Sequence, residues 1–174
     1  AQDGGGLLIV GSSPTIEYCE IYNNTANWGA GFWVEYGTPI INYCTISNNS
    51  GSYGSGFHSY IGSPQISNSI IWGNTGENIN IYNGSVSINY SNINNYSGAG
   101  SNNIDLDPLF CDATNGNFSI YDNSPCVSNG ENEYLIGANG IGCQSSYIYT
   151  SIEGNDFTGN GSFSNPYRNI QIAI

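Results

Sequence analysis

A regular internal repeat constrains this chain more than any other feature of its sequence, because a fixed period of about 25 residues commits the chain to one repeating structural unit. Three kinds of residue keep this step over three copies. They are Pro14, Pro39 and Pro64; Asn24, Asn49 and Asn74; and Gly6, Gly31 and Gly56. A fourth copy has a shorter step, because Ile88 follows Ile66 more closely than Ile66 follows Ile41.

Apolar residues alternate within the copies, as at Leu7 and Ile9 and again at Phe32 and Val34. This period of two is typical of strands, and the intervening glycine, asparagine and proline break any helix. Short strands in such a unit cannot bury an apolar face alone, so successive units must stack about 4.8 Å apart. The sequence therefore predicts an all-β parallel β-solenoid, with about four coils over residues 1–93.

Stacking places equivalent side chains in columns along the solenoid. Ile16, Ile41 and Ile66 are expected to form an inward column. The repeated asparagines are expected at a turn, where each amide can pair with the next coil. A leucine-rich repeat would need a denser leucine pattern, and a β-sandwich would not keep one register over three copies.

The charge of the chain excludes several classes of partner. It has 13 Asp and Glu against one Lys or Arg, a formal net charge of -12, so it cannot form the basic patch that nucleic acids or anionic membranes require. No stretch approaches the roughly 20 apolar residues of a membrane span. Charged residues make up only 8% of the chain, so Asn, Ser, Thr and Gly must hydrate its surface. That composition favours an extracellular or cell-surface location.

The coil sequences resemble a known family. The segment from Gly11 to Cys19, which contains Ser13, Pro14 and Ile16, and its two later copies are similar to right-handed parallel β-helix repeats of the pectate-lyase-like superfamily. Within it, the resemblance is to secreted surface proteins and polymorphic-outer-membrane-type repeats. It covers residues 4–93 and implies a right-handed solenoid in an extracellular setting.

Residues 94–145 resemble the final coil and closing cap of such domains. The similarity lies in four short stretches: Asp107–Asp112, Asn115–Phe118, Asn123–Cys126 and Ile136–Ala138. We expect this segment to cover the open end of the solenoid, because an uncovered end is an unpaired sheet edge that invites aggregation.

Residues 146–174 resemble the first strand and capping helix of such domains, although here they come last. Three arrangements fit this order: an interior slice of a tandem array, a circular permutant, and a segment that caps the next copy in a head-to-tail filament. We favour an end-to-end assembly with other copies or adjacent repeats. Its expected interface residues are Gly6, Leu7, Ile9, Tyr147, Ile148, Tyr149, Ile170 and Ile172.

The five cysteines fall into two groups. Cys19 and Cys44 occupy the same position in successive copies, so they stack in adjacent coils as either two packed thiols or a disulfide. The resemblance implies a further cysteine near Glu133 that this chain lacks. On that comparison Cys111 pairs with Cys143, and Cys126 is left free.

Nothing in the coils resembles a catalytic centre, so we predict that the chain is not an enzyme and needs no cofactor or metal. Lyases on this fold need a strong base and cations, and the only candidates are His58 and Arg168. Hydrolases need two carboxylates about 5–10 Å apart across the sugar bond. Glu17 and Glu20 lie in the first coil, and no acidic residue recurs at their positions in the later coils.

Two aromatic pairs offer a recognition surface. Trp33 and His58 share one outward position of the repeat, and Trp28 and Tyr53 share another. Exposed aromatic columns can stack sugars or pack against a protein, although ordinary lateral packing of a turn would place the same residues there. These four residues are the predicted ligand-binding site.

The sequence predicts a non-catalytic structural module of an extracellular surface protein, adhesin or filament, which self-assembles through its solenoid ends. The alternative is a β-helix that binds or cleaves carbohydrate. The predicted partners are copies of the chain or adjacent repeats, with glycans as a further possibility.

Overall fold

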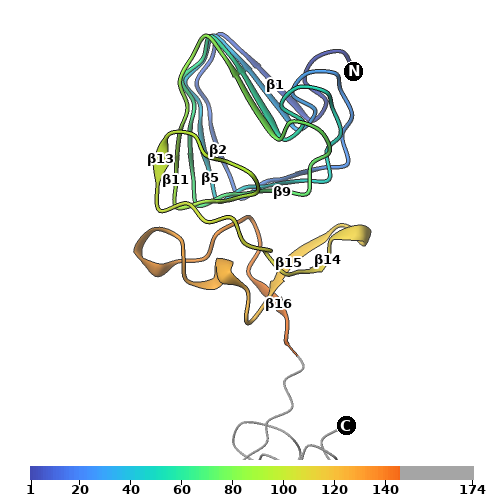
Figure 1. Cartoon of the computed structure of the whole chain (residues 1–174), viewed down its shortest axis with the longest axis vertical. Coiled ribbons are helices and arrows are strands. Elements are labelled where there is room, and N and C mark those ends of the chain that lie inside the picture. The colour runs from blue at the N-terminus through green and yellow to red at the C-terminus, as the bar shows by residue number, and fades with distance from the viewer. Residues whose placement is uncertain (146–174) are drawn as a thin grey trace, which may run out of the picture. The chain divides into compact units, whose positions relative to one another are not determined.

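The structure, a computed structural model, describes residues 1–145 and shows a right-handed parallel β-solenoid of about five turns. Three parallel sheets form its walls (Figure 1). The first contains β1 (Leu7–Val10), β4 (Phe32–Glu35), β7 (Phe57–Tyr60) and β10 (Ile79–Tyr82). The second contains β2 (Thr15–Glu17), β5 (Ile40–Asn42), β8 (Gln65–Ser67), β11 (Ser87–Asn89) and β13 (Gly100–Ser101). The third contains β3 (Glu20–Tyr22), β6 (Thr45–Ser47), β9 (Ile70–Trp72) and β12 (Asn92–Ile93).

The strand register confirms the repeat. Each strand of the first two coils pairs with the strand one full period later, as Phe32 does with Phe57. The proline positions also align, because the Ile40 amide donates to the carbonyl oxygen of Pro14 at 3.0 Å. The fourth coil follows at the shorter step and pairs Ile88 with Ile66, and a short fifth coil pairs Gly100 with Ile88.

The core is an apolar column inside the three walls. The residues predicted to point inward are fully buried in the middle coils, where Phe32, Val34 and Phe57 have 0% exposure. The column of Ile41, Ile66 and Ile88 is equally covered, whereas Ile16 in the first coil is only partly buried. Burial of whole Ile and Phe side chains, worth about 1.5–3 kcal/mol each, holds the coils together.

A chain of asparagine side chains runs through the solenoid beside the apolar core. Asn24 Nδ2 donates to Asn49 Oδ1, and Asn49 Nδ2 donates to Asn74 Oδ1, each at 3.0 Å. Asn74 then donates to Asn78 at 2.9 Å, and Asn78 donates to Asn94 at 3.0 Å. We call this chain from Asn24 to Asn94 the asparagine ladder. It matches the expectation that the repeated asparagines pair from coil to coil at a turn.

The closing segment differs from the expectation that it covers the end of the solenoid. It comprises β14 (Phe110–Asp112), η1 (Ala113–Asn115), β15 (Asn117–Tyr121), η2 (Pro125–Val127), η3 (Glu131–Glu133) and β16 (Ile141–Cys143). β14 and β15 form an antiparallel hairpin, and β16 joins β15 in parallel. Figure 1 shows these strands beside the coils rather than in line with them.

Hydrogen bonds attach the closing segment along the outer side of the third sheet. The Glu131 amide donates to Asn68 Oδ1 at 2.8 Å, and the Ala138 amide donates to Thr45 Oγ1 at 3.0 Å. A second apolar cluster lies between them and contains Ile70, Ile120, Cys126 and Ile136. The segment takes this lateral position because Ile70 projects outward from β9 and needs apolar cover.

Two of the five cysteines form a disulfide, and the other three are free. A disulfide joins Cys111 to Cys143, the pair that the family resemblance favoured, with a Cα–Cα distance of 6.0 Å. Cys126 is free and buried. The possible disulfide between Cys19 and Cys44 is not formed. Cys44 instead lies buried with its thiol directed at the carbonyl oxygens of Ile16 and Asn42, while Cys19 is exposed.

Asn49 is the residue whose replacement tests whether the asparagine ladder stabilises the fold. It is fully buried, accepts a hydrogen bond from Asn24 and donates to Ile21 O as well as to Asn74. We expect Asn49→Ala to lower the free energy of unfolding by about 2–4 kcal/mol, because it leaves several buried polar groups without partners. The exposed Asn27, whose side chain makes no such bond, supplies the control Asn27→Ala. Equal urea midpoints for the two variants would contradict a stabilising ladder.

The free cysteines predict an order of thiol reactivity. Burial raises the pKa of the Cys44 thiol to about 11, and burial also raises the pKa of Cys126. Because the thiolate is the reactive form, an aromatic disulfide reagent at neutral pH should label Cys19 at once and the two buried thiols only after unfolding. Mass spectrometry of peptides from folded and urea-treated protein reads out the order. Rapid labelling of Cys44 in the folded protein would show that the coils open there.

Candidate functional site

The outer face of the first sheet carries two columns of side chains that its register creates. One column contains Leu8, Trp33, His58 and Asn80. The other contains Val10, Glu35, Tyr60 and Tyr82. Each column rises from coil to coil, since outward positions alternate with the buried inward ones. Polar and aromatic groups are therefore gathered on one side of the solenoid.

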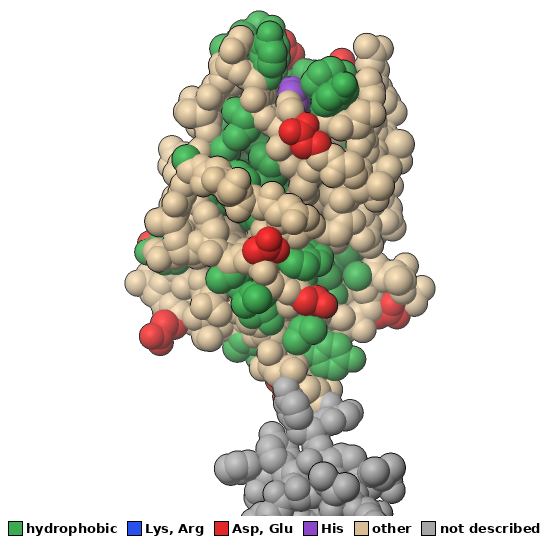
Figure 2. All heavy atoms as spheres, in the orientation of Figure 1, with side chains coloured by type: hydrophobic (Ala, Val, Ile, Leu, Met, Phe, Trp, Pro, Cys, Tyr) green, Lys and Arg blue, Asp and Glu red, His purple; other side chains and the backbone are tan. Residues whose placement is uncertain are grey.

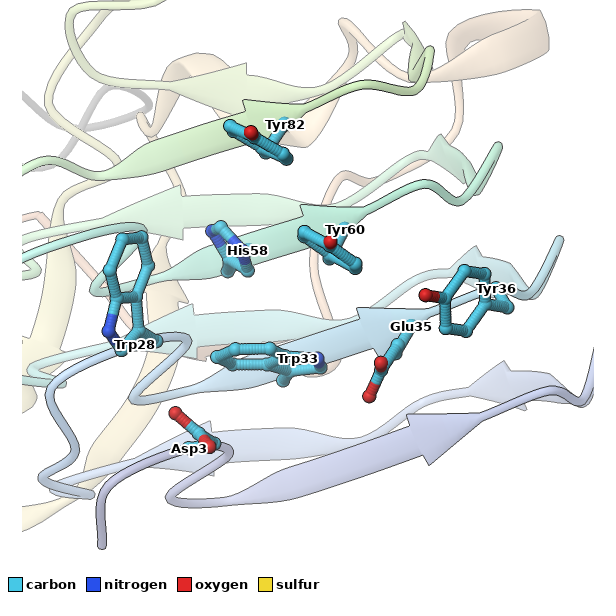
Figure 3. A pocket seen from close by; sticks show the side chains of 8 residues that line it. All are labelled: Asp3, Trp28, Trp33, Glu35, Tyr36, His58, Tyr60 and Tyr82. Carbon is cyan, nitrogen blue, oxygen red and sulfur yellow. The ribbon is translucent and has the colours of Figure 1, made fainter.

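A groove of about 460 Å³ lies over these columns (Figure 3). We call it the aromatic groove. It is lined by Asp3, Trp28, Trp33, Glu35, Tyr36, His58, Tyr60 and Tyr82. A concave surface of this size with a few polar groups among aromatic rings is the usual form of a small-ligand site.

Trp28 forms one wall of the aromatic groove. Its indole stacks on Tyr53 of the next coil, with ring centres 4.1 Å apart, and meets the rings of Trp33 and His58 edge-on. Gly29 makes this possible, because its φ of 56° is in the left-handed region and a side chain there would meet Trp33 Cβ at 2.9 Å. The glycine lets the Trp28 turn fold closely onto the strand that carries Trp33.

Tyrosines form the opposite wall. The rings of Tyr60 and Tyr82 are stacked with an interplanar angle of 4° and centres 5.2 Å apart. Tyr36 meets Tyr60 edge-on at 5.8 Å. Tyr36 and Tyr82 are 54% and 52% exposed, so their rings remain available to a ligand.

His58 lies between these walls and is only 1% exposed. Burial lowers the pKa of its imidazole, and the hydrogen bond with Asn80 and the charges of Glu77 and Asp3 oppose that shift. The ring is therefore neutral at pH 7. Its Nδ1 atom and the Nε1 atom of Trp33 have no hydrogen-bond partner among the described residues. Buried polar atoms are normally paired, so these two mark a place for a ligand or water.

The charge in the aromatic groove has one sign. Asp3 and Glu35 are its two carboxylates, and they lie at the side of the groove nearest the first coil (Figure 3). The only Lys or Arg of the chain is Arg168, outside the described residues. The face drawn in Figure 2 accordingly shows red acidic side chains and no blue ones on the described part.

The structure brings three of the four predicted ligand-binding residues to the aromatic groove. Trp28, Trp33 and His58 line it, whereas Tyr53 supports Trp28 from behind. An exposed aromatic column was expected, and His58 is instead buried because the rings of Trp28 and Trp33 cover it.

Five residues that line the aromatic groove were not predicted: Asp3, Glu35, Tyr36, Tyr60 and Tyr82. The repeat carried a signal for four of them. Tyr60 follows Glu35 by one full period and Tyr82 follows Tyr60 by the shorter step, which are the steps of the third and fourth coils. Asp3 precedes Trp28 by one full period and pairs with it, whereas Tyr36 has no aromatic or polar counterpart one period away.

Two features are absent from the part of the chain that the structure describes. No three His, Cys, Asp or Glu side chains lie close enough together there to hold a metal ion. No helix among residues 1–145 has the length and apolar character needed to cross a membrane.

A family profile described as a right handed beta helix region matches residues 1–97, which is more than half of the chain. The chain belongs to the right-handed β-helix family. No curated protein and no solved structure matches it. In this β-helix protein every residue that lines the aromatic groove falls within the matched region, whereas the closing segment lies outside it.

His58 predicts a pH dependence of stability. Because its folded pKa is below the unfolded value of 6.5, the unfolded chain binds the proton more readily, and stability is lost as the pH falls through and below 6.5. We expect the Tm of the β-helix protein to fall between pH 7.5 and pH 5 more steeply than that of His58→Gln. Differential scanning calorimetry of both proteins measures the difference. Parallel curves would mean that His58 titrates as in an unfolded peptide.

Proposed function

We propose that this chain is a non-catalytic structural module of an extracellular surface protein or filament, whose coils stack end to end with other copies or adjacent repeats. The observation that carries the proposal is the open polar edge of the first coil. Three further features support it: the asparagine ladder, the disulfide and the charge distribution.

Among the described residues, β1, β2 and β3 each pair with a neighbouring strand on one side only. An open strand edge is a template for pairing with another chain. Of the predicted interface residues, Gly6 is exposed just before β1, and Leu7 and Ile9 point toward the core within it. The other five lie outside the described residues.

The asparagine ladder gives the two ends of the solenoid opposite polarity. At the first coil, Asn24 Oδ1 receives no hydrogen bond from the described residues. At the other end, Asn94 accepts from Asn78, and its own Nδ2 has no acceptor among residues 1–145. A head-to-tail neighbour can therefore continue the ladder, because the last amide donates where the first one accepts.

Two features support an extracellular setting. The Cys111–Cys143 disulfide is a kind of bond that persists in oxidising compartments and is rare in the cytosol. Only 8% of the chain is charged, so uncharged polar residues such as Asn and Ser must hydrate the walls of the solenoid.

The composition of the aromatic groove supports a role without catalysis. Its imidazole, His58, is buried and neutral. The described residues contain no Lys or Arg to stabilise the charge that develops when a uronate is cleaved.

End-to-end stacking predicts concentration-dependent assembly that a proline on the open edge blocks. The Leu7 and Gly11 amides donate to the second coil, so by alternation the amide of Leu8 faces the open side of β1. Leu8→Pro removes only that open donor and is tolerated on an edge strand. Leu8→Thr is the control, since its side chain is 50% exposed.

Light scattering and electron microscopy should show elongated assemblies of the full chain and of Leu8→Thr, whose axial repeat equals one subunit. Leu8→Pro should remain monomeric at the same concentrations. If the unmodified chain stays monomeric across the whole range, stacking between free copies is wrong.

Carbohydrate binding is a second candidate function. One observation favours it: the aromatic groove combines stacked rings with two unpaired ring nitrogens, Trp33 Nε1 and His58 Nδ1. Rings that stack on sugar faces and polar atoms that meet hydroxyl groups are the two elements of a sugar site.

A further inference from the structure

The class of ligand that suits the aromatic groove follows from its hydrogen-bonding groups, its rings and its charge. This inference rests on the second candidate function, carbohydrate binding, and is independent of end-to-end stacking.

His58 presents one unpaired ring nitrogen in the aromatic groove. Its Nδ1 atom is buried and has no hydrogen-bond partner among the described residues. Asn80 lies beside His58 in the first sheet, and its Nδ2 donates to Glu77 Oε2 at 2.7 Å. A neutral imidazole has one donor and one acceptor nitrogen, so Nδ1 can meet a ligand group of either kind.

Trp33 supplies a donor of fixed character a short distance away. Its indole Nε1–H is a donor only, and the ring centre is 4.7 Å from that of His58. The two unpaired atoms of the aromatic groove are thus a donor and an imidazole nitrogen that can accept or donate. A sugar that carries hydroxyl and amine groups can satisfy both, since hydroxyls accept and amines and hydroxyls donate.

The charges of the aromatic groove select among sugars. Asp3 and Glu35 have no cationic partner among the described residues, and the neutral His58 does not compensate them. A uronate would bring a third carboxylate into this site and be repelled. An ammonium group would be attracted both by the carboxylates and by the faces of the surrounding aromatic rings.

We propose that the aromatic groove binds a basic glycan, one whose sugars carry free amines, in preference to neutral glycans, and that it rejects uronates. Asp3 and Glu35 attract the amine, Trp33 and His58 pair with polar groups of the sugar, and the tyrosine wall stacks on its ring.

Calorimetric titration with three sets of oligosaccharides of equal length tests the proposal: glucosamine, N-acetylglucosamine and galacturonate oligomers. At about pH 6 and low salt, the glucosamine oligomer should bind about fivefold or more tightly than its acetylated counterpart, because each exposed charge pair changes affinity by about two- to fivefold. Added salt should reduce that ratio, since the attraction is between partly exposed charges. Galacturonate should not bind. Reducing ends measured in the same samples should not increase.

Two variants distinguish the contribution of the Glu35 carboxylate to glycan binding from that of the Trp33 hydrogen-bond donor. Glu35→Gln should weaken glucosamine binding about two- to fivefold and leave the neutral oligomer unchanged. The control is Glu133→Gln, an exposed carboxylate in the closing segment that should change neither. Trp33→Phe, which keeps a ring but removes the donor, should weaken both oligomers by about two- to tenfold. Circular dichroism checks that each variant is folded.

The outcomes distinguish the inference from the function on which it rests. Equal affinity for all three glycans, or tighter binding of galacturonate, would overturn the preference for amines and leave carbohydrate binding intact. If no oligomer binds to the folded protein, carbohydrate binding at the aromatic groove is wrong as well.

Discussion

The structure depends on hydrogen bonding between equivalent positions of successive coils. The asparagine ladder makes this register specific: Asn49 is fully buried, yet its amide is satisfied only when Asn24 and Asn74 lie directly before and after it. A slip by a single position would leave those amides unpaired and turn the Phe32 and Phe57 side chains out of the core. Apolar burial supplies most of the stability of the solenoid, and the polar ladder restricts it to a single register.

The same register builds the aromatic groove. Outward positions of β4, β7 and β10 come into line only because the inward ones do, so the columns that hold Trp33 and His58 are a consequence of core packing. The shorter step of the fourth coil does not disturb this alignment: Tyr82 still lies beside Tyr60, and Asn80 lies beside His58. The coil is shortened in the turn just before β10, because Ser50 pairs with Thr75 at the full step whereas the Ser55 amide donates to Glu77 at the shorter one.

The repeat of about 25 residues in the sequence made the fold and part of the aromatic groove predictable. Repeated positions identified the inward residues, the asparagine ladder and the pairing of Trp33 with His58. The position of the closing segment was not predictable from resemblance, although the adjacent Ile70 and Ile71 indicated a strand buried on both faces. The burial of His58 depends on how the Trp28 turn folds over it, and single-residue periodicity carries no such information. The unpaired ring nitrogens require three-dimensional geometry to be recognised.

The proposed assembly and the proposed binding use different surfaces. End-to-end stacking occupies the open edges of β1, β2 and β3, whereas the aromatic groove lies on the outer face of the first sheet. Stacking therefore leaves the groove accessible, and an array would repeat it once per subunit. Weak contacts to a polymeric glycan would then add through effective concentration, so an array could hold a polymer that a single module releases. A shallow groove with exposed tyrosines is consistent with that division, because affinity arises from repetition rather than from deep enclosure of one ligand.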